Sequence, residues 1–321
     1  MITIVDLNYS QNIYPLLSKA LLDNISKASE SWWKVMIYFN RRWESTALFC
    51  KDCWYMAKCK YCDIPFSIHR YPSNKLICHQ CDASDDLPDS CPKCKSKNLI
   101  WVWTWIQKIE DHIKRTFPNK RIIRLDSDKA KKEWVSYEEI KNSDIIIATQ
   151  MANAIWIDWL KLLAIPLFEA ELSIPEYDIE EQIYSNIMLN VKRWADVIIQ
   201  SYTPNHDLLK IIANWNYNDF LKYTLSEREK FNYPPFVDMA KIVIRSKNME
   251  KVRHLSTTIF NKLGFMDEEK RYIINFNEEK IARIWEDYIK SIIIRWKDLQ
   301  KFIENVEFDI ARNREVSLEW K

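Results

Sequence analysis

All eight cysteines of this 321-residue chain lie in one stretch, as four Cys-x-x-Cys pairs between residues 50 and 94. A Cys-x-x-Cys turn brings two thiolates close enough to share one ion, and two such turns complete a tetrahedral four-sulfur zinc site. The stretch therefore predicts two structural zinc ions, which hold loops in place and do no chemistry because a four-sulfur shell is closed. The pairs are Cys50/Cys53, Cys59/Cys62, Cys78/Cys81 and Cys91/Cys94.

Two other uses of cysteine fit this pattern less well. A disulfide scaffold is typical of a short secreted chain, whereas this chain is long and shows no signal segment. A redox Cys-x-x-Cys would be single and would open a helix after a strand. The spacing leaves open which pairs share an ion. Consecutive pairs would give two ribbons side by side, whereas nested pairs would join Cys50/Cys53 to Cys91/Cys94 around an inner site.

Charge and hydropathy limit which binding partners and which membrane association the sequence predicts. The formal net charge is +2, so bulk electrostatics by itself predicts neither a nucleic-acid nor a membrane partner. The longest apolar runs, such as LLAIPLF at residues 162–168, are far too short to cross a bilayer. Since the thiols are expected to be reduced, we expect a cytoplasmic protein without membrane association.

One glycine, Gly264, and fifteen tryptophans make the composition abnormal. Average usage of ~7% predicts about 22 glycines in a chain of this length. Several tryptophans stand where a turn is expected, such as Trp54 after a Cys-x-x-Cys pair and Trp194 after Lys192 and Arg193. Tight turns need the positive φ that glycine tolerates and tryptophan does not. We therefore hypothesise that many of these tryptophans are glycines, encoded by UGA in a cell that reads this codon as glycine.

Hydrophobic periodicity predicts strands that alternate with helices. Helices are expected at 11–29, 106–117, 177–190, 205–214 and 218–231, and strands at 34–39, 121–126, 144–150, 162–168 and 195–202. This alternation is typical of a parallel, doubly wound α/β sheet, which places ligands at the carboxyl ends of its strands. The polar residues at those ends are Asn40, Arg41, Arg42, Thr149 and Gln150. The pair Arg41-Arg42 is either a solvated corner or a phosphate contact.

Two prolines in the sequence Tyr233-Pro234-Pro235-Phe236 predict a domain boundary. Beyond them, strands at 239–245, 288–295 and 306–311 and a helix that ends at Leu263 predict a small α+β domain. The expected domains are an α/β lobe formed by 1–49 and 98–231, an inserted zinc module at 50–97, and an incomplete C-terminal domain at 232–321.

A series of motifs resembles one family through nearly the whole chain. They are NRRW at 40–43, CxxCxYMAKCxxC at 50–62, CHxC at 78–81, CPKC at 91–94, VWTWIQKIE at 102–110, RLDSD at 124–128, ATQM at 148–151 and YPPF at 233–236. Their order resembles that in primosomal protein N-prime, the PriA-type replication-restart DNA helicases. The eight-cysteine stretch is the most specific part of the match. Reading tryptophan as glycine sharpens it, for example to CGYMAKC.

The resemblance implies a RecA-like second helicase lobe with an inserted two-zinc module, followed by part of a C-terminal domain. It implies 3′-to-5′ unwinding of forked or single-stranded DNA, and docking of other primosome proteins. Thr104, Thr149 and Gln150 match positions that face the DNA strand, and Asn40, Arg41 and Arg42 are further candidates for DNA contact. It also implies nested zinc pairing. One ion is assigned to Cys50, Cys53, Cys91 and Cys94, and the other to Cys59, Cys62, Cys78 and Cys81.

The departures from the family concern catalysis. The sequence contains neither a GxxxxGK[ST] phosphate loop nor a DExH-like run. The segment NIMLNVKRW at 186–194 stands in place of the last helicase motif and keeps its final arginine, Arg193, as the candidate arginine finger. We therefore expect no ATP hydrolysis by this chain alone. We expect ATP and Mg²⁺ only beside a first helicase lobe, which is either encoded elsewhere or lost from this gene. The alternatives are a non-catalytic DNA-binding or primosome-docking protein, and an inert truncated translation.

Overall fold

The computed structural model describes most of the chain, in two compact units. The described residues are 1–14, 17–30, 32–39, 48–50, 52–53, 55–61, 65–69, 75–78, 83–101, 106–125, 136–149, 157–172, 176–192, 194–276, 281–284, 286–304 and 313–320. The first unit comprises Met1–Ala57, Pro65–Asn74 and Leu87–Leu221, and the second comprises Lys58–Ile64, Lys75–Asp86 and Lys222–Lys321. Two segments of the cysteine-rich stretch, 58–64 and 75–86, therefore belong to the second unit.

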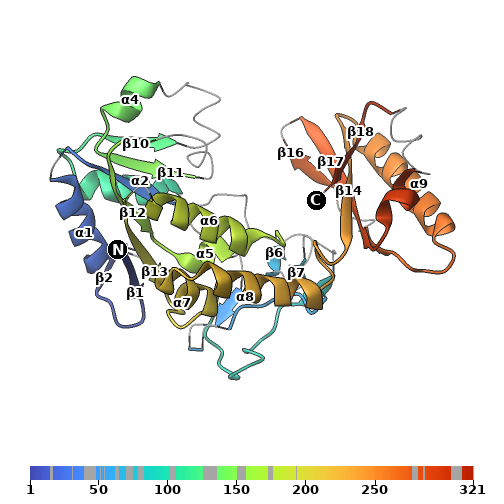
Figure 1. Cartoon of the computed structure of the whole chain (residues 1–321), viewed down its shortest axis with the longest axis horizontal. Helices are drawn as coiled ribbons and strands as arrows, with labels where there is room; N and C mark the ends of the chain where they lie inside the picture. The colour runs from blue at the N-terminus through green and yellow to red at the C-terminus, as the bar shows by residue number, and fades with distance from the viewer. Residues whose placement is uncertain are drawn as a thin grey trace. The chain divides into compact units, whose positions relative to one another are not determined.

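A six-stranded sheet organises the first unit (Figure 1). Its order is β1–β13–β12–β4–β11–β10, and every neighbouring pair of strands is parallel. The strands are β1 (Ile2–Asp6), β4 (Lys34–Tyr38), β10 (Ile122–Leu125), β11 (Ile145–Ala148), β12 (Leu160–Ile165) and β13 (Asp196–Ser201). Every residue of β4 and β11 is buried, as parallel strands covered on both faces require. The predicted parallel α/β sheet is therefore confirmed.

Helices α1 (Lys19–Ser29), α2 (Ile106–Thr116), α5 (Phe168–Leu172), α6 (Ile179–Lys192) and α7 (Asp207–Asn214) pack with this sheet. Two further helices are α4 (Tyr137–Lys141), between β10 and β11 in the chain, and α8 (Tyr217–Lys230), whose residues from Lys222 onward belong to the second unit. Leu21 and Ile25 of α1 share one apolar core with Ile109 and Ile113 of α2 and with side chains of β4, β11 and β12. Helices α5 and α6 contact β13, and α7 contacts β1. Among the described helices, none is both long and apolar enough to span a membrane.

The helix expected at 11–29 begins later than its periodicity indicates. Residues Asn12–Tyr14 form β2 and Leu17–Ser18 form β3, and these two strands pair antiparallel. Helix α1 starts at Lys19 because Ser18 is its N-cap, with its Oγ accepting from the N–H of Leu21 at 3.1 Å. This bond satisfies one of the amides that a helix start leaves unpaired. The helix prediction was wrong for residues 12–14 and 17–18.

Among the described residues, three tryptophans have the left-handed backbone conformation that favours glycine. Trp159, Trp194 and Trp215 have φ values of 62°, 66° and 55°. Trp194 follows α6, and Trp215 is the C-cap of α7, with its N–H donating to Ile212 O at 3.2 Å. Helices commonly end in this way with a glycine, since a side chain there is strained. The one glycine of the sequence instead lies within helix α9. This placement supports the hypothesis that some of these tryptophans are glycines.

An antiparallel sheet organises the second unit. Its order is β15–β17–β14–β18, with β16 on β17. Its strands are β14 (Asp238–Ser246), β15 (Ile273–Asn275), β16 (Ala282–Ile284), β17 (Asp287–Trp296) and β18 (Val316–Trp320). Helix α9 (Met249–Met266) packs on it through Val252, Ile259 and Leu263, which share a core with Ile242 and Ile294. The strand expected at 306–311 lies outside the described residues. Further short strands among the described residues include β6 (Ser67–His69), β7 (Lys75–Ile77) and β8 (Ser84–Asp86).

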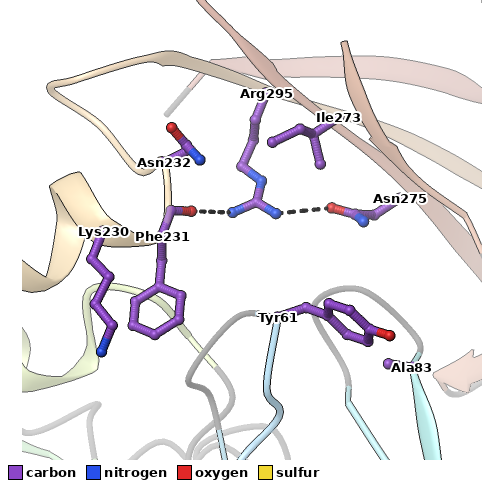
Figure 2. Close-up of a pocket in the computed structure, with 8 residues that line it drawn as sticks. All are labelled: Tyr61, Ala83, Lys230, Phe231, Asn232, Ile273, Asn275 and Arg295. Atoms are coloured by element: carbon purple, nitrogen blue, oxygen red, sulfur yellow. Dashed lines mark hydrogen bonds between the residues drawn. The ribbon is translucent and has the colours of Figure 1, made fainter. Parts of the chain in front are cut away.

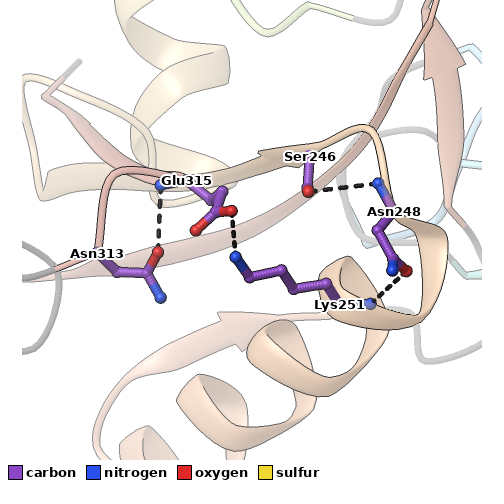
Figure 3. Close-up of polar contacts among 5 residues, drawn as sticks. All are labelled: Ser246, Asn248, Lys251, Asn313 and Glu315. Carbon is purple, nitrogen blue, oxygen red and sulfur yellow. Dashed lines mark hydrogen bonds and ion pairs between the residues drawn. The ribbon is translucent and has the colours of Figure 1, made fainter.

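Polar contacts tie the start of α9 to the strands beside it (Figure 3). Asn248 is the N-cap, and its Oδ1 accepts from the N–H of Lys251 at 3.1 Å. Its own N–H donates to Ser246 Oγ at 3.3 Å. The Lys251 ammonium pairs with the Glu315 carboxylate, and the N–H of Glu315 donates to Asn313 Oδ1 at 3.1 Å. The first turn of the helix is thereby joined to the end of β14 and to the chain just before β18.

Candidate metal centre

Two short strands frame a cluster of cysteines in the first unit. Strand β5 (Leu48–Cys50) pairs antiparallel with β9 (Leu99–Trp101), and Cys50 stands opposite Leu99. The side chains of Leu48 and Phe49 are almost fully buried. The first Cys-x-x-Cys turn follows β5 and the last one precedes β9. This pairing therefore brings together two turns that lie far apart in the sequence.

Both turns are closed by the same kind of backbone hydrogen bond. The N–H of Cys50 donates to Tyr55 O at 2.9 Å, and the N–H of Cys91 donates to Ser96 O at 2.8 Å. Lys95, directly after Cys94, has a φ of 62°, a conformation that favours glycine. The residue at the corresponding place after Cys53 is Trp54, one of the tryptophans suspected to be glycine.

The four sulfur atoms of Cys50, Cys53, Cys91 and Cys94 all lie within 4.8 Å of one another. The Sγ atoms of Cys50 and Cys94 are 3.5 Å apart, and those of Cys53 and Cys91 are 3.6 Å apart. A tetrahedral zinc with Zn–S bonds of about 2.3 Å places its sulfur ligands about 3.8 Å from one another. The six cysteines among the described residues form no disulfide bond. This group of thiols could therefore hold one zinc ion.

Burial and hydrogen bonding move the pKa values of Cys53 and Cys91 in opposite directions. Burial raises the pKa of Cys53 to about 12, and the hydrogen bonds to the sulfurs of Cys94, Cys91 and Cys50 add to the rise. Burial also acts to raise the pKa of Cys91, but hydrogen bonds from the backbone N–H groups of Cys94 and Lys93, together with those to the sulfurs of Cys53 and Cys94, lower this pKa to about 7. Four neighbouring thiols cannot all ionise without a cation, and a metal ion supplies that charge.

Asp52 joins the two turns and was not anticipated from the sequence. It lies in the first turn, and its carboxylate accepts from the Ser96 hydroxyl, which belongs to the second turn. Asn98 Nδ2 donates to both carboxylate oxygens, at 3.1 and 3.0 Å. The N–H of Asn98 also donates to Ser96 Oγ at 2.9 Å. The sequence shows only that an acidic residue lies inside a Cys-x-x-Cys pair. It does not show that this residue contacts Ser96 and Asn98.

Replacing Asp52 with alanine should loosen the cysteine cluster. The change removes charge-assisted hydrogen bonds to Ser96 and Asn98, and because Asp52 is exposed the expected loss is about 1 kcal/mol. Competition with a chromogenic zinc chelator should show weaker zinc retention in Asp52→Ala than in the unchanged protein. Asp89→Ala, an exposed aspartate of the same stretch, is the matched control and should retain zinc normally. Equal retention in both variants would contradict the proposed bridging role.

The other sequence-predicted site residues fall partly within the described residues. Cys59 and Cys78 of the expected second zinc site are buried, whereas Cys62 and Cys81 lie outside the described part. Thr149 follows β11 at the carboxyl edge of the sheet, is 6% exposed, and directs its hydroxyl to Leu125 O at 3.4 Å. The expected DNA-contacting and catalytic residues that lie outside the described part are Asn40, Arg41, Arg42, Thr104, Gln150 and Arg193.

The three curated relatives described next are all the replication restart protein PriA, each from a different bacterium. The replication restart protein PriA of Borreliella burgdorferi is 30% identical over 317 residues, 94% of this chain and 48% of that protein. The PriA of Bacillus subtilis is 25% identical over 92% of this chain and 39% of its own length. The PriA of Chlamydia pneumoniae is 32% identical over 72% of this chain and 33% of its own length.

No protein-family model matches the chain. The designed protein Foldit4 is similar to 26% of it with a TM-score of 0.23, a likeness too weak to indicate a shared fold. The chain spans less than half the length of the PriA relatives named above, and the alignments are consistent with the C-terminal portion of PriA. The chain belongs to the family of the replication restart protein PriA.

Proposed function

We propose that this chain is the C-terminal part of a replication-restart primosomal helicase and contains its second, RecA-like lobe. The match to PriA relatives over nearly the whole chain carries this proposal. The parallel sheet supports it, since ligands of such sheets lie at the carboxyl ends of the strands. Five of the candidate DNA contacts, Asn40, Arg41, Arg42, Thr149 and Gln150, stand at such ends in the sequence, and the sixth, Thr104, precedes the helix expected at 106–117.

We further propose that the chain binds two structural zinc ions in nested pairing. Cys50, Cys53, Cys91 and Cys94 bind the first ion, and the sulfur distances among them support this set. The second ion is assigned to Cys59, Cys62, Cys78 and Cys81. Since both shells are closed, zinc stabilises the turns and the surface on which primosome proteins dock, and takes no part in ATP hydrolysis.

Unwinding requires a first helicase lobe that supplies the phosphate loop. The 321 residues contain no GxxxxGK[ST] sequence, so the β- and γ-phosphates of ATP have no backbone cradle in this chain. In the proposed assembly a first helicase lobe binds ATP and Mg²⁺, and Arg193 of this chain reaches the phosphates as an arginine finger. Such a residue can contribute ~10³-fold or more to the rate of phosphoryl transfer.

The experiment that tests this function mixes the zinc-loaded chain with a purified phosphate-loop lobe of a PriA relative and a forked DNA. DNA-stimulated ATP hydrolysis should appear in the mixture and be absent from either protein alone. Arg193→Ala should lower this turnover by ~10³-fold, and Lys192→Ala, its exposed neighbour, should not. Fork binding without any turnover would contradict the helicase function.

A second candidate function is a non-catalytic DNA-binding or primosome-docking protein. One observation favours it: Asn190, which stands in place of the first arginine of the last helicase motif, is 2% exposed within α6. Its Nδ2 donates to Asn186 O at 2.8 Å, inside the same helix. A side chain used in this way is not available to a phosphate. Fork binding or capture of a primosome protein with no turnover would select this function.

A further inference from the structure

A pocket in the second unit contains a buried cation that has no anionic partner among the described residues (Figure 2). The pocket has a volume of about 350 Å³. Arg295, near the end of β17, contributes the cation, and its side chain is 3% exposed. The residues that line the pocket are Tyr61, Ala83, Lys230, Phe231, Asn232, Ile273, Asn275 and Arg295, with no acidic side chain among them.

Neutral groups hold the guanidinium in place. Arg295 Nη1 donates to Phe231 O at 3.1 Å, and Nη2 donates to Asn275 Oδ1 at 3.3 Å. The ring of Tyr233 lies 4.7 Å from Cζ, while Nε finds no acceptor in the described part of the chain. A guanidinium carries five N–H donors, so donors remain for a ligand. Burying a charge without a counter-ion costs free energy, which an oxyanion in the pocket would offset.

The remaining lining groups suit a nucleotide better than a simple anion. Figure 2 shows the terminal nitrogens of Arg295 between Phe231 O and the Asn275 side chain, with the ring of Tyr61 across the pocket. Phe231 and Tyr61 offer aromatic rings on which a base can stack. The ammonium of Lys230, an exposed residue, lies 4.7 Å from the centre of the Phe231 ring and adds a second positive charge. The planar fork of arginine matches the oxygens of a phosphate.

We propose that this pocket binds the phosphate group of a nucleotide, with the base stacked against Tyr61 or Phe231. The inference rests on the proposed association of the protein with DNA and adds a recognition site to it. The phosphate belongs either to a free nucleotide or to the 5′ end of a DNA strand, because the two present the same group. A cavity of this size is within the range of small-ligand pockets.

The test replaces Asn275 with aspartate in the full zinc-loaded chain. The new carboxylate can still accept the hydrogen bond from Arg295, so the fold is preserved, but it neutralises the guanidinium and repels an anion. Fluorescence anisotropy of a labelled 5′-phosphorylated oligothymidylate should report binding that weakens by about 10-fold to 100-fold in Asn275→Asp. Asn261→Asp, an exposed position on α9 of the same unit, makes the same change in net charge and should bind as the unchanged protein does.

Competitors identify the source of the phosphate. Displacement by thymidine monophosphate at concentrations comparable to the phosphorylated strand assigns the pocket to free nucleotides, and much weaker displacement assigns it to strand ends. Equal binding by the unchanged protein, Asn275→Asp and Asn261→Asp would overturn the proposal. Displacement by a peptide with a free C-terminal carboxylate, but not by thymidine monophosphate, would also overturn it. Binding of a 5′-hydroxyl forked DNA that Asn275→Asp leaves unchanged separates DNA association elsewhere on the chain from this pocket.

Discussion

Replacing Cys91 with serine should lower the zinc content of the chain from two ions to one. Cys91 is fully buried, with its sulfur 3.6 Å from that of Cys53, and a closed shell that loses one of four thiolates no longer holds its ion. Structural zinc sites contribute roughly 10–16 kcal/mol of apparent binding free energy in small zinc modules, so local structure should be lost with the metal. Metal analysis by mass spectrometry measures the stoichiometry, and amide hydrogen exchange of β5 and β9 measures the unfolding.

A double variant makes this prediction specific for nested pairing. In Cys50→Ser/Cys91→Ser both lost thiolates belong to the same proposed shell, so one zinc should remain, as in the single variant. If consecutive pairs shared an ion, the same double variant would damage both shells and leave none. Ser90→Ala, the residue before Cys91, should keep both ions. A zinc content of two ions per chain in Cys91→Ser would contradict zinc binding by Cys50, Cys53, Cys91 and Cys94.

Replacing Trp194 and Trp215 together with glycine should stabilise the first unit. Both residues have left-handed backbone at the end of a helix, where a side chain costs about 1–2 kcal/mol that glycine does not incur. Part of this stabilisation is offset because glycine loses more backbone entropy on folding, which costs about 0.5–1 kcal/mol of free energy per residue. The indoles are largely exposed, at 90% and 53%, so little burial is given up. We expect the free energy of unfolding to rise by about 1–2 kcal/mol in the double variant, measured by chemical denaturation.

The matched control replaces the same two tryptophans with alanine. Alanine also removes the indole but keeps the Cβ atom, so it should not raise the free energy of unfolding comparably. The difference in free energy of unfolding between the two double variants therefore measures the cost of the left-handed backbone conformation. Equal stability of the glycine and alanine variants would show that the left-handed conformation is not costly here. The nucleotide sequence tests the wider hypothesis directly, since codons other than UGA at these positions would exclude glycine.

Hydrophobic periodicity located most elements of the first unit because their buried faces are long and regular. The strands expected at 34–39, 144–150 and 195–202 are present as β4, β11 and β13. The start of α1 was missed because the apolar spacing of residues 11–18 resembles that of a helix, while the Ser18 cap and the β2–β3 pairing determine where the helix begins. Strand β1 was missed as well. It is a short strand whose partner, β13, is far away in the sequence.

Some of the candidate functional residues could be predicted from the sequence and others could not. Cysteine spacing predicted Cys50, Cys53, Cys91 and Cys94 as metal ligands, because the thiol chemistry is carried by residue type, and in the folded chain their sulfur atoms lie within 4.8 Å of one another. The Asp52 bridge and the buried Arg295 could not be predicted. Their significance depends on partners such as Ser96 and Asn275, and those contacts exist only in the folded chain.

The sequence by itself determined that strands would alternate with helices, and its paired cysteines predicted a metal-binding stretch. It did not determine which pairs share an ion, because a Cys-x-x-Cys spacing specifies only the local turn. The tertiary structure decided only which turns meet: antiparallel pairing of β5 with β9 places Cys50 opposite Leu99 and brings the first Cys-x-x-Cys turn to the last, so that four thiols which could share an ion lie together. Strand order in the parallel sheet was decided in the same way, since which strands become neighbours depends on contacts between segments distant in the sequence.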